Sequence, residues 1–257
     1  MNRLLGKKPF VRDGRDLLLS RYVDAKRVFS ADQAPRLLDW TAVKLASGAL
    51  AEPDRDPLAN DRLSCCTFSA GGHFQNLIAQ HVGRPDLRVT AEMVERDYLR
   101  ITGGDNGASI RDDLLKTWRR DGLWGTKVLA YALVDWTNDE ELALANMLAG
   151  GLLGGYLLPL ASQAQNDDQG RPQWTVPAGG FPAGQGPGTW GPHAICTSGE
   201  DAGNTWGQSV VWDQPWRLAT CDELWFCLLD VWRVGDRAPN GFAWQDLVAD
   251  AEARAAQ

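Results

Sequence analysis

Two stretches of the chain carry residues that can do nucleophilic chemistry. In the first, residues 60–81 (NDRLSCCTFSAGGHFQNLIAQH), a polar loop places a cysteine in the first turn of an expected helix, with Ser64 as its cap. A thiol there experiences the positive end of the helix dipole and free backbone N–H groups, which favour the thiolate and lower its pKa. The structural alternative is that Cys65 and Cys66 pack as small apolar residues.

The second stretch contains a histidine that can face a cleft. His193 follows a long loop rich in glycine, proline and glutamine, residues 166–191, and begins an apolar run that predicts a strand. The other two histidines, His73 and His81, lie in the helix expected after Cys66. Imidazole is the side chain most often used as a general base, although a lone histidine also serves structural roles. The sequence therefore offers a candidate nucleophile and, far along the chain, a candidate base.

Helices and strands alternate around these two stretches and must position them. Helical spacing predicts helices over 66–81, 89–101 (with Thr90 as its cap), 112–120 and 139–148. Residues 102–107 (TGGDNG) predict a tight turn. Apolar runs predict strands over 127–134, over 152–158 and from 193, a turn at 200–203 with a return over 204–212, and a strand or helix over 224–231.

Length, charge and composition exclude several classes of protein. The 257 residues suit one large domain or two packed lobes, and a net charge of −7 argues against nucleic acid as the main partner. No run approaches the roughly 18–20 apolar residues of a membrane span, and the first ten residues do not resemble a signal peptide. Five cysteines, an odd number, fit a reducing compartment. We therefore expect a cytoplasmic protein without membrane contact.

Taken in order, the motifs of the chain resemble those of the papain-like cysteine peptidases. That family has a nucleophilic cysteine at a helix start, a His-Ala pair at a strand start and a later Asn-x-Trp-Gly motif. The counterparts here are Cys66, His193-Ala194 and Asn204-Thr205-Trp206-Gly207. Asn60 takes the position, six residues before the nucleophile, of a family glutamine that donates to the oxyanion. Asp39-Trp40 is similar to the mature N-terminal segment, and Asp105-Asn106-Gly107 to the glycine-rich wall of the substrate cleft.

More closely, the chain from about Gly6 to Trp232 resembles a divergent papain-like group found in actinobacterial genomes and their phages. The shared motifs are Asn60-Asp61, Cys66-Thr67, Gly72-His73, His193-Ala194, Thr205-Trp206-Gly207-Gln208 and Asp222-Glu223. Two motifs depart from the pattern, because Ser64-Cys65 replaces Gly-Asp and Pro192 replaces the glycine before the histidine.

The resemblance implies an α+β, papain-like fold of two lobes. A helical lobe, about residues 36–125, would carry the cysteine helix, and a β-rich lobe, about residues 126–257, would carry His193. Residues 1–35 would form an extended N-terminal arm, which is too short for the inhibitory propeptide usual in the family.

The resemblance also implies the roles of the site residues. Cys66 would be the nucleophile and His193 the general base, with Asn204 orienting the imidazole. Asn60 and the Cys66 backbone N–H would bind the oxyanion. Asp213 is a rival to Asn204, because only eleven residues separate His193 from Asn204 and a turn centred near 202–203 would bring Asp213 opposite the histidine.

Other roles for the cysteines and histidines remain open at this point. A metal site formed by Cys65, Cys66, His73 and His193 has no known structural-zinc spacing, so we expect neither a metal nor a cofactor. Cys65 is expected to pack, with a vicinal disulfide to Cys66 as the alternative. We expect His73 to be a buried histidine bonded to the backbone.

Two functions follow. The first is a thiol hydrolase, a cysteine peptidase or amidase that acts on a peptide or amide substrate. The second is a catalytically inactive papain-like module that serves as a structural or interaction protein, which the resemblance to the phage group would associate with a virion. In that case residues 1–35 would act as a docking arm to phage structural proteins or in self-association.

Overall fold

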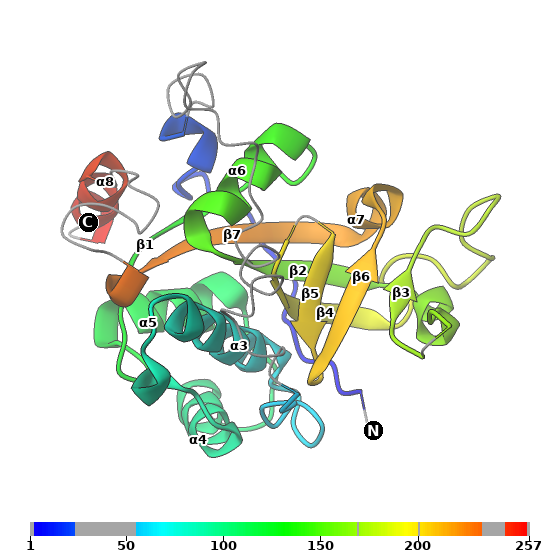
Figure 1. The fold of residues 1–257 in the computed structure, drawn as a ribbon, viewed down its shortest axis with the longest axis horizontal. Helices are drawn as coiled ribbons and strands as arrows, with labels where there is room; N and C mark the ends of the chain where they lie inside the picture. The colour runs from blue at the N-terminus through cyan, green and yellow to red at the C-terminus, as the bar shows by residue number, and fades with distance from the viewer. Residues whose placement is uncertain (1–2, 24–54, 169, 200, 233–244, 256–257) are drawn as a thin grey trace.

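The computed structural model describes residues 3–23, 55–168, 170–199, 201–232 and 245–255. In these ranges a group of helices lies beside a seven-stranded sheet (Figure 1). The Asp39-Trp40 pair and the second part of the expected arm lie outside the described residues. Within the described ranges, no helix is long and apolar enough to cross a membrane.

The helical part of the fold begins with the helix that contains the candidate nucleophile. It consists of α3 (Cys66–His81), the turn η2 (Pro85–Leu87), α4 (Ala91–Thr102), the π-helical turn η3 (Ile110–Leu115) and α5 (Lys116–Asp121). The Thr90 side chain accepts a hydrogen bond from the Met93 N–H at the start of α4, and Gly103 ends that helix with a φ of 71°. The helices expected over 66–81, 89–101 and 112–120 are confirmed, as is the tight turn over 102–107.

The start of α3 differs from the expectation. Cys65, not Ser64, is the N-cap residue, and its side chain makes no capping hydrogen bond. Ser64 instead donates its backbone N–H to Asp105 Oδ1 at 2.8 Å. The first-turn N–H groups of α3 are therefore not satisfied by the residue before the helix.

The sheet is assembled mostly from antiparallel neighbours. Its strands are β1 (Val128–Leu133), β2 (Leu152–Leu158), β3 (Gln173–Trp174), β4 (Gly191–Thr197), β5 (Ala202–Thr205), β6 (Gln208–Trp212) and β7 (Cys221–Leu229). The order is β1-β7-β2-β4-β5-β6-β3, and only β3 and β6 pair in parallel. The remaining elements are η1 (Leu19–Arg21), α6 (Asp139–Ala149), η4 (Leu160–Ala164), α7 (Gln214–Thr220), η5 (Asp230–Trp232) and α8 (Gln245–Ala255).

Two predicted features of the β-rich part need correction. The return over 204–212 is two strands, because Trp206 and Gly207 have φ angles of 51° and 68° and turn the chain back between β5 and β6. The preceding turn lies before Ala202, where β5 begins, and is not centred on 202–203. The ambiguous run over 224–231 is mainly strand, since β7 extends to Leu229.

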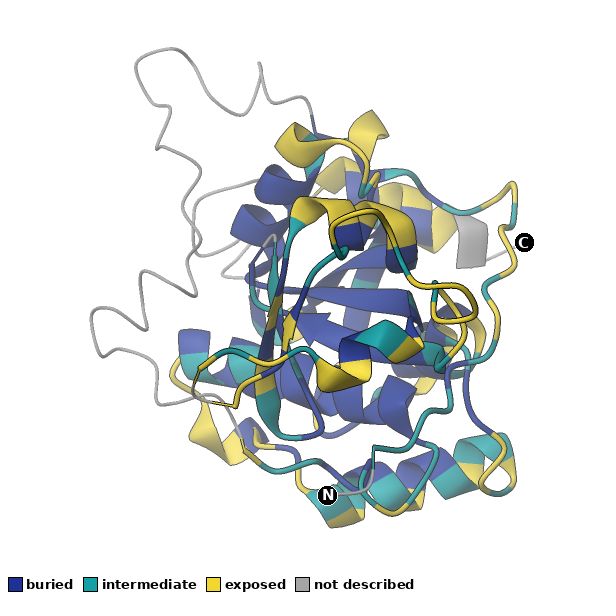
Figure 2. Ribbon diagram, turned by 90° about the vertical axis from the view of Figure 1, so that its right-hand side faces the viewer, coloured by how far each residue is buried: buried dark blue, intermediate teal, exposed yellow. Residues whose placement is uncertain are grey.

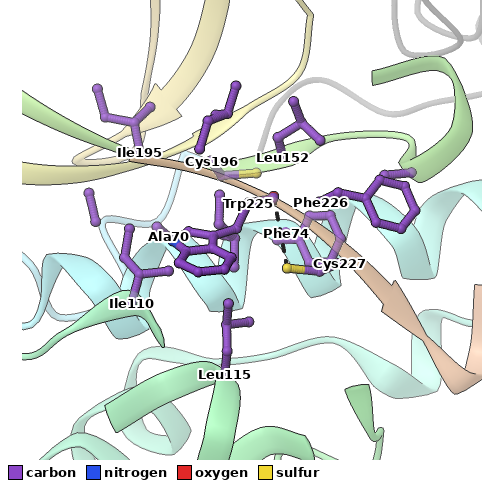
Figure 3. Packing of buried hydrophobic residues seen from close by; sticks show 14 of the residues in the cluster. Ala70, Phe74, Ile110, Leu115, Leu152, Ile195, Cys196, Trp225, Phe226 and Cys227 are labelled. Atoms are coloured by element: carbon purple, nitrogen blue, oxygen red, sulfur yellow. Dashed lines mark hydrogen bonds between the residues drawn. The ribbon is translucent and has the colours of Figure 1, made fainter. Parts of the chain in front are cut away.

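The core lies between α3 and the sheet. Figure 3 shows Ala70 and Phe74 of α3 close to Trp225 and Cys227 of β7, and the strands in the centre of the molecule are buried (Figure 2). The late tryptophans belong to this core, and each of them is at most 5% exposed: Trp206, Trp212, Trp216, Trp225 and Trp232. Their burial explains the high tryptophan content.

The described N-terminal residues pack along both parts of the fold. Lys7 forms a parallel backbone bridge with Ala108, and the Leu133 N–H of β1 donates to the Leu17 carbonyl at 2.7 Å. Residues 3–23 of the expected arm are therefore built into the folded domain.

One buried side chain fixes α3 against the loops around it. Gln75 donates to the Leu87 and Trp124 carbonyls, each at 2.8 Å, and accepts from Thr126 Oγ1 at 2.7 Å. Buried polar groups that lose a partner cost about 1–3 kcal/mol each. This network therefore contributes to the placement of the cysteine helix.

We expect Gln75→Met to lower the free energy of unfolding by about 2–3 kcal/mol, because the Leu87 and Trp124 carbonyls lose a side-chain donor and the Thr126 hydroxyl loses one of its acceptors. Urea unfolding followed by tryptophan fluorescence measures the change. Gln80→Met is the matched control, since Gln80 lies on the same helix with a half-buried side chain. Equal stabilities for the two variants would contradict the role assigned to Gln75.

Candidate active site

Helix α3 places the Cys66 thiol against the start of β4. The backbone N–H groups of Ala194 and Gly6 approach the sulfur and favour the thiolate, as does the charge of Lys7. Burial acts in the opposite direction and dominates, because Cys66 is 1% exposed: it raises the pKa of the Cys66 thiol. The lowered pKa expected from the helix start is therefore wrong for this state of the protein.

His193 lies one residue before Ala194 on β4, next to the backbone that approaches the thiol. Its Nε2 is 2.6 Å from Thr205 Oγ1, and its ring stacks on Trp206 with 4.1 Å between the ring centroids. Nδ1 is buried and has no hydrogen-bond partner among the described residues. Burial, followed by the charge of Lys7, lowers the pKa of His193 to about 3. The imidazole is therefore neutral at neutral pH.

The residue at Nε2 is not the one expected from the sequence. In the β4–β5 pair, Cys196 is opposite Asn204. Because side chains alternate between the two faces of a strand, this register places Asn204 on the face away from His193 and Thr205 on the same face as His193. The Thr205 hydroxyl therefore takes the position that the motif match assigned to Asn204.

The other expected candidates have different roles in the structure. Asp213 is the N-cap of α7, where its Oδ1 accepts from the Trp216 N–H at 2.8 Å. Cys65 is a free thiol that lies 3.3 Å from Ser69 Oγ, and burial raises its pKa to about 12. His73 is buried in α3. Among the described residues, no three His, Cys, Asp or Glu side chains are grouped to hold a metal ion.

Two side-chain donors converge on a carbonyl oxygen of the chain itself. Asn60 Nδ2 donates to the Leu4 oxygen at 3.2 Å, and Trp206 Nε1 donates to the same oxygen at 3.1 Å. Asn60 also donates to the Leu63 carbonyl at 3.2 Å, which fixes its amide. Two N–H donors on one carbonyl oxygen are what a developing oxyanion requires. The sequence indicated the first donor but not the second.

The Leu4 carbonyl belongs to the N-terminal segment, defined here as residues 3–10, which fills the site. The Ala108 N–H donates to the Gly6 carbonyl at 2.8 Å, and the Lys8 N–H donates to the Ala108 carbonyl at 2.9 Å. A Cβ on Gly6 would lie 1.8 Å from the Ser64 oxygen, so this passage admits only glycine. The segment thus pairs with Ala108, the residue directly after the glycine-rich wall expected at 105–107.

A hydrogen-bond network ties this wall to the loop before the nucleophile. Asp105 Oδ1 accepts from the Ser64 N–H and from the Tyr98 hydroxyl, both at 2.8 Å. The Tyr98 oxygen in turn accepts from the Gly107 N–H at 2.8 Å. Tyr98 and Asp105 therefore fix the two edges between which the N-terminal segment lies. No sequence motif had identified Tyr98.

Backbone strain is concentrated around the same site. Of the four described non-glycine residues with positive φ, three adjoin the donors: Leu58 and Ala59 directly precede Asn60, and Trp206 is itself a donor. Such conformations cost on the order of 1–3 kcal/mol each and persist where the surrounding structure enforces them. Their position supports a functional role for this region.

Comparison with known proteins finds a solved structure with a similar fold. No family model matches the chain, and no curated protein matches it. Among solved structures, the chain is similar to the crystal structure of xylellain, a cysteine protease from Xylella fastidiosa, with a TM-score of 0.55 and 15% sequence identity. The match covers 88% of this chain and 96% of that chain.

At this identity the comparison establishes the fold alone. The chain has the expected α+β, papain-like fold, with a helical lobe that carries the cysteine helix and a β-rich lobe that carries the histidine. The finer resemblance to an actinobacterial and phage group stays a prediction.

The depressed pKa of His193 predicts stability that is lost in acid. A group whose folded pKa lies below its unfolded value of about 6.5 stabilises the protein above pH 6.5, and this contribution is lost as the pH falls. Relative to His193→Gln, we expect the free energy of unfolding of the wild type to fall by about 1.4 kcal/mol per pH unit between about pH 6 and 4. Urea titrations at each pH measure the difference. A difference that stays constant over this range would contradict the buried neutral imidazole.

Proposed function

We propose that the protein is a papain-like thiol hydrolase, a cysteine peptidase or amidase, that its own N-terminal segment holds in a latent state. Cys66 is the nucleophile and His193 the general base. Thr205, in place of Asn204, orients the imidazole, and Asn60 and Trp206 donate to the oxyanion.

The observation that carries this proposal is the carbonyl of Leu4. Its oxygen is bound by Asn60 and Trp206, while the N–H of Gly6 approaches the Cys66 sulfur. A peptide of the chain itself therefore lies across the thiol with an acyl oxygen on two convergent donors. Two convergent donors on an acyl oxygen near a thiol are part of what an acyl substrate of a thiol hydrolase needs.

Each of these groups has a defined role in the proposed reaction. With a peptide or amide in the cleft, Cys66 gives its proton to Nδ1 of His193, and the thiolate attacks the acyl carbon. The oxyanion forms at the donors of Asn60 and Trp206. The imidazolium then protonates the departing amine, and water hydrolyses the thioester with His193 as base. Thr205 at Nε2 fixes the ring, and the indole of Trp206 keeps water from that hydrogen bond.

Occupancy by the N-terminal segment explains the neutral state of both groups. Burial is the first cause of the raised pKa of Cys66 and of the lowered pKa of His193. Departure of the segment would admit water to the cleft, so both pKa values would return toward their ordinary range and an ion pair would become accessible. Release of the segment and activation of the thiol are therefore one event.

The second candidate function is a catalytically inactive papain-like module that acts as a structural or interaction protein, for which the sequence suggested a phage particle. The buried thiol and the occupied cleft favour it. The two candidates differ in what happens when the segment leaves.

A single substitution in the full-length protein is expected to displace the N-terminal segment from the site. An alanine Cβ at position 6 would collide with the Ser64 oxygen, whereas Gly14 has no atom within 4 Å of its Cβ position and gives the matched control Gly14→Ala. We expect Gly6→Ala to raise the rate of Cys66 alkylation by iodoacetamide at pH 7.5 at least about tenfold, and Gly14→Ala to leave it unchanged. Site-resolved mass spectrometry measures both rates, and circular dichroism verifies the fold.

The same variant tests catalysis. Hydrolysis of internally quenched peptides should appear in Gly6→Ala and be lost in Gly6→Ala/Cys66→Ser and Gly6→Ala/His193→Ala. If a folded Gly6→Ala protein exposes Cys66 but hydrolyses no peptide, amide or ester, the inactive module is the better description. If Cys66 stays unreactive, the segment does not cause latency. Lys7→Met releases the segment at a second point should Gly6→Ala fail to fold.

A further inference from the structure

A lysine of the N-terminal segment is bound in an acidic pocket beside the candidate nucleophile. Lys7 Nζ lies 2.9 Å from Asp222 Oδ2 and 2.9 Å from Glu223 Oε1, and it donates to the Lys8 carbonyl at 3.3 Å. The lysine side chain is completely buried. The ammonium therefore uses all three of its donors inside the protein.

The pocket is shaped to receive a long side chain. A Cβ on Gly155 of β2 would lie 2.6 Å from Glu223 Cγ and 2.7 Å from Lys7 Cε, so the absence of a side chain there makes the space that the lysine fills. Trp225 Nε1 donates to Glu223 Oε2 at 2.6 Å and fixes that carboxylate. The pocket thus has a glycine floor and a positioned acidic wall.

The two carboxylates of the pocket have more acceptor capacity than the Lys7 ammonium uses. Lys7 is the only described residue that forms an ion pair with Asp222 or Glu223, so two acidic groups face one cation. Asp222 Oδ1 is buried and has no hydrogen-bond partner among the described residues. An acceptor therefore remains that a guanidinium, with five donors, could also use.

The pocket adjoins the reacting groups through β2. Gly155 is paired with Glu223 on one side and with Ala194 on the other, and the Ala194 N–H approaches Cys66. The backbone of Lys7 lies on the wall at Ala108. A side chain in the pocket and an acyl oxygen at Asn60 and Trp206 therefore belong to one extended peptide.

We propose that Gly155, Asp222 and Glu223 form a specificity subsite for a lysine or arginine side chain of the substrate, and that Lys7 occupies it in the latent protein. This inference rests on the proposed hydrolase function and names its substrate class as peptides with a basic residue near the scissile bond. A merely structural ion pair would not require the bound cation to lie on the segment that fills the cleft.

Substrate scanning tests the subsite in the full-length Gly6→Ala/Lys7→Ala protein, in which the pocket is empty. Internally quenched peptides carry one lysine, arginine, norleucine or glutamate, moved along an alanine–leucine background. At one position we expect kcat/KM to be about tenfold to a hundredfold higher for lysine or arginine than for norleucine, as charge-assisted hydrogen bonds imply. Adding Glu223→Gln should reduce this ratio to about threefold or less, whereas Glu140→Gln, an exposed carboxylate on α6, should not change it.

A second measurement does not depend on activity. Lys7→Ala removes the equivalent of n-propylammonium from the pocket, so this ion should raise the melting temperature of Lys7→Ala by several degrees, and 1-propanol should not. The rise should be absent in Lys7→Ala/Glu223→Gln. Peptides hydrolysed with no preference for a basic residue would overturn the subsite and leave the hydrolase intact. If no peptide is hydrolysed, the hydrolase proposal fails. If n-propylammonium also does not raise the melting temperature of Lys7→Ala, the cation pocket is overturned as well.

Discussion

The N-terminal segment lies against the site through polar groups that find partners there. The Leu4 carbonyl is bound by two side chains, the Gly6 carbonyl by the Ala108 N–H, and the Lys7 ammonium by two carboxylates. An unpaired buried carbonyl would cost about 1–3 kcal/mol and an unpaired ammonium more. The site is therefore complementary to an extended peptide along its backbone and at one basic side chain. The same complementarity would serve recognition of another chain.

Close approach of backbone to backbone makes this complementarity geometrically possible. Gly6 passes the Ser64 oxygen at a distance that excludes any side chain, and a Cβ on Gly107 would lie 2.4 Å from the Gly6 oxygen. The strained backbone at Leu58, Ala59 and Trp206 positions the donors around the same peptide. Conformational strain and missing side chains thus concentrate where the segment lies, as functional sites often show.

Burial links the occupancy of the cleft to the chemistry of the thiol. In a buried site the neutral thiol and neutral imidazole are favoured over the ion pair, because the desolvation cost exceeds the help that nearby N–H groups and Lys7 give to the thiolate. The charge of Lys7 also disfavours the imidazolium. The helix start at Cys66 favours a thiolate only where water or a substrate can share the charge. Local structure and tertiary burial therefore act in opposite directions on one sulfur atom.

The sequence by itself determined the elements and the fold class, and it nominated Cys66 and His193 as the candidate reacting groups. Periodic apolar positions, the Thr90 cap and the glycine-rich turn over 102–107 are local signals, and the structure follows them closely. The order of Cys66, His193 and the Trp206-Gly207 motif also indicated a papain-like fold, because that order depends on sequence alone. These features require no knowledge of which strands pair.

Tertiary structure alone decided which groups meet. The register of β4 on β5 places Thr205, not Asn204, on the face of His193, and a shift of one residue would reverse that choice. The lysine near the N-terminus and the carboxylates at 222 and 223 are more than two hundred residues apart, so no local pattern predicts their contact. The pKa of Cys66 depends on how completely the chain covers it, which is a property of packing. Spacing along a sequence specifies elements, whereas register and burial, which set the site, arise only when distant segments pack together.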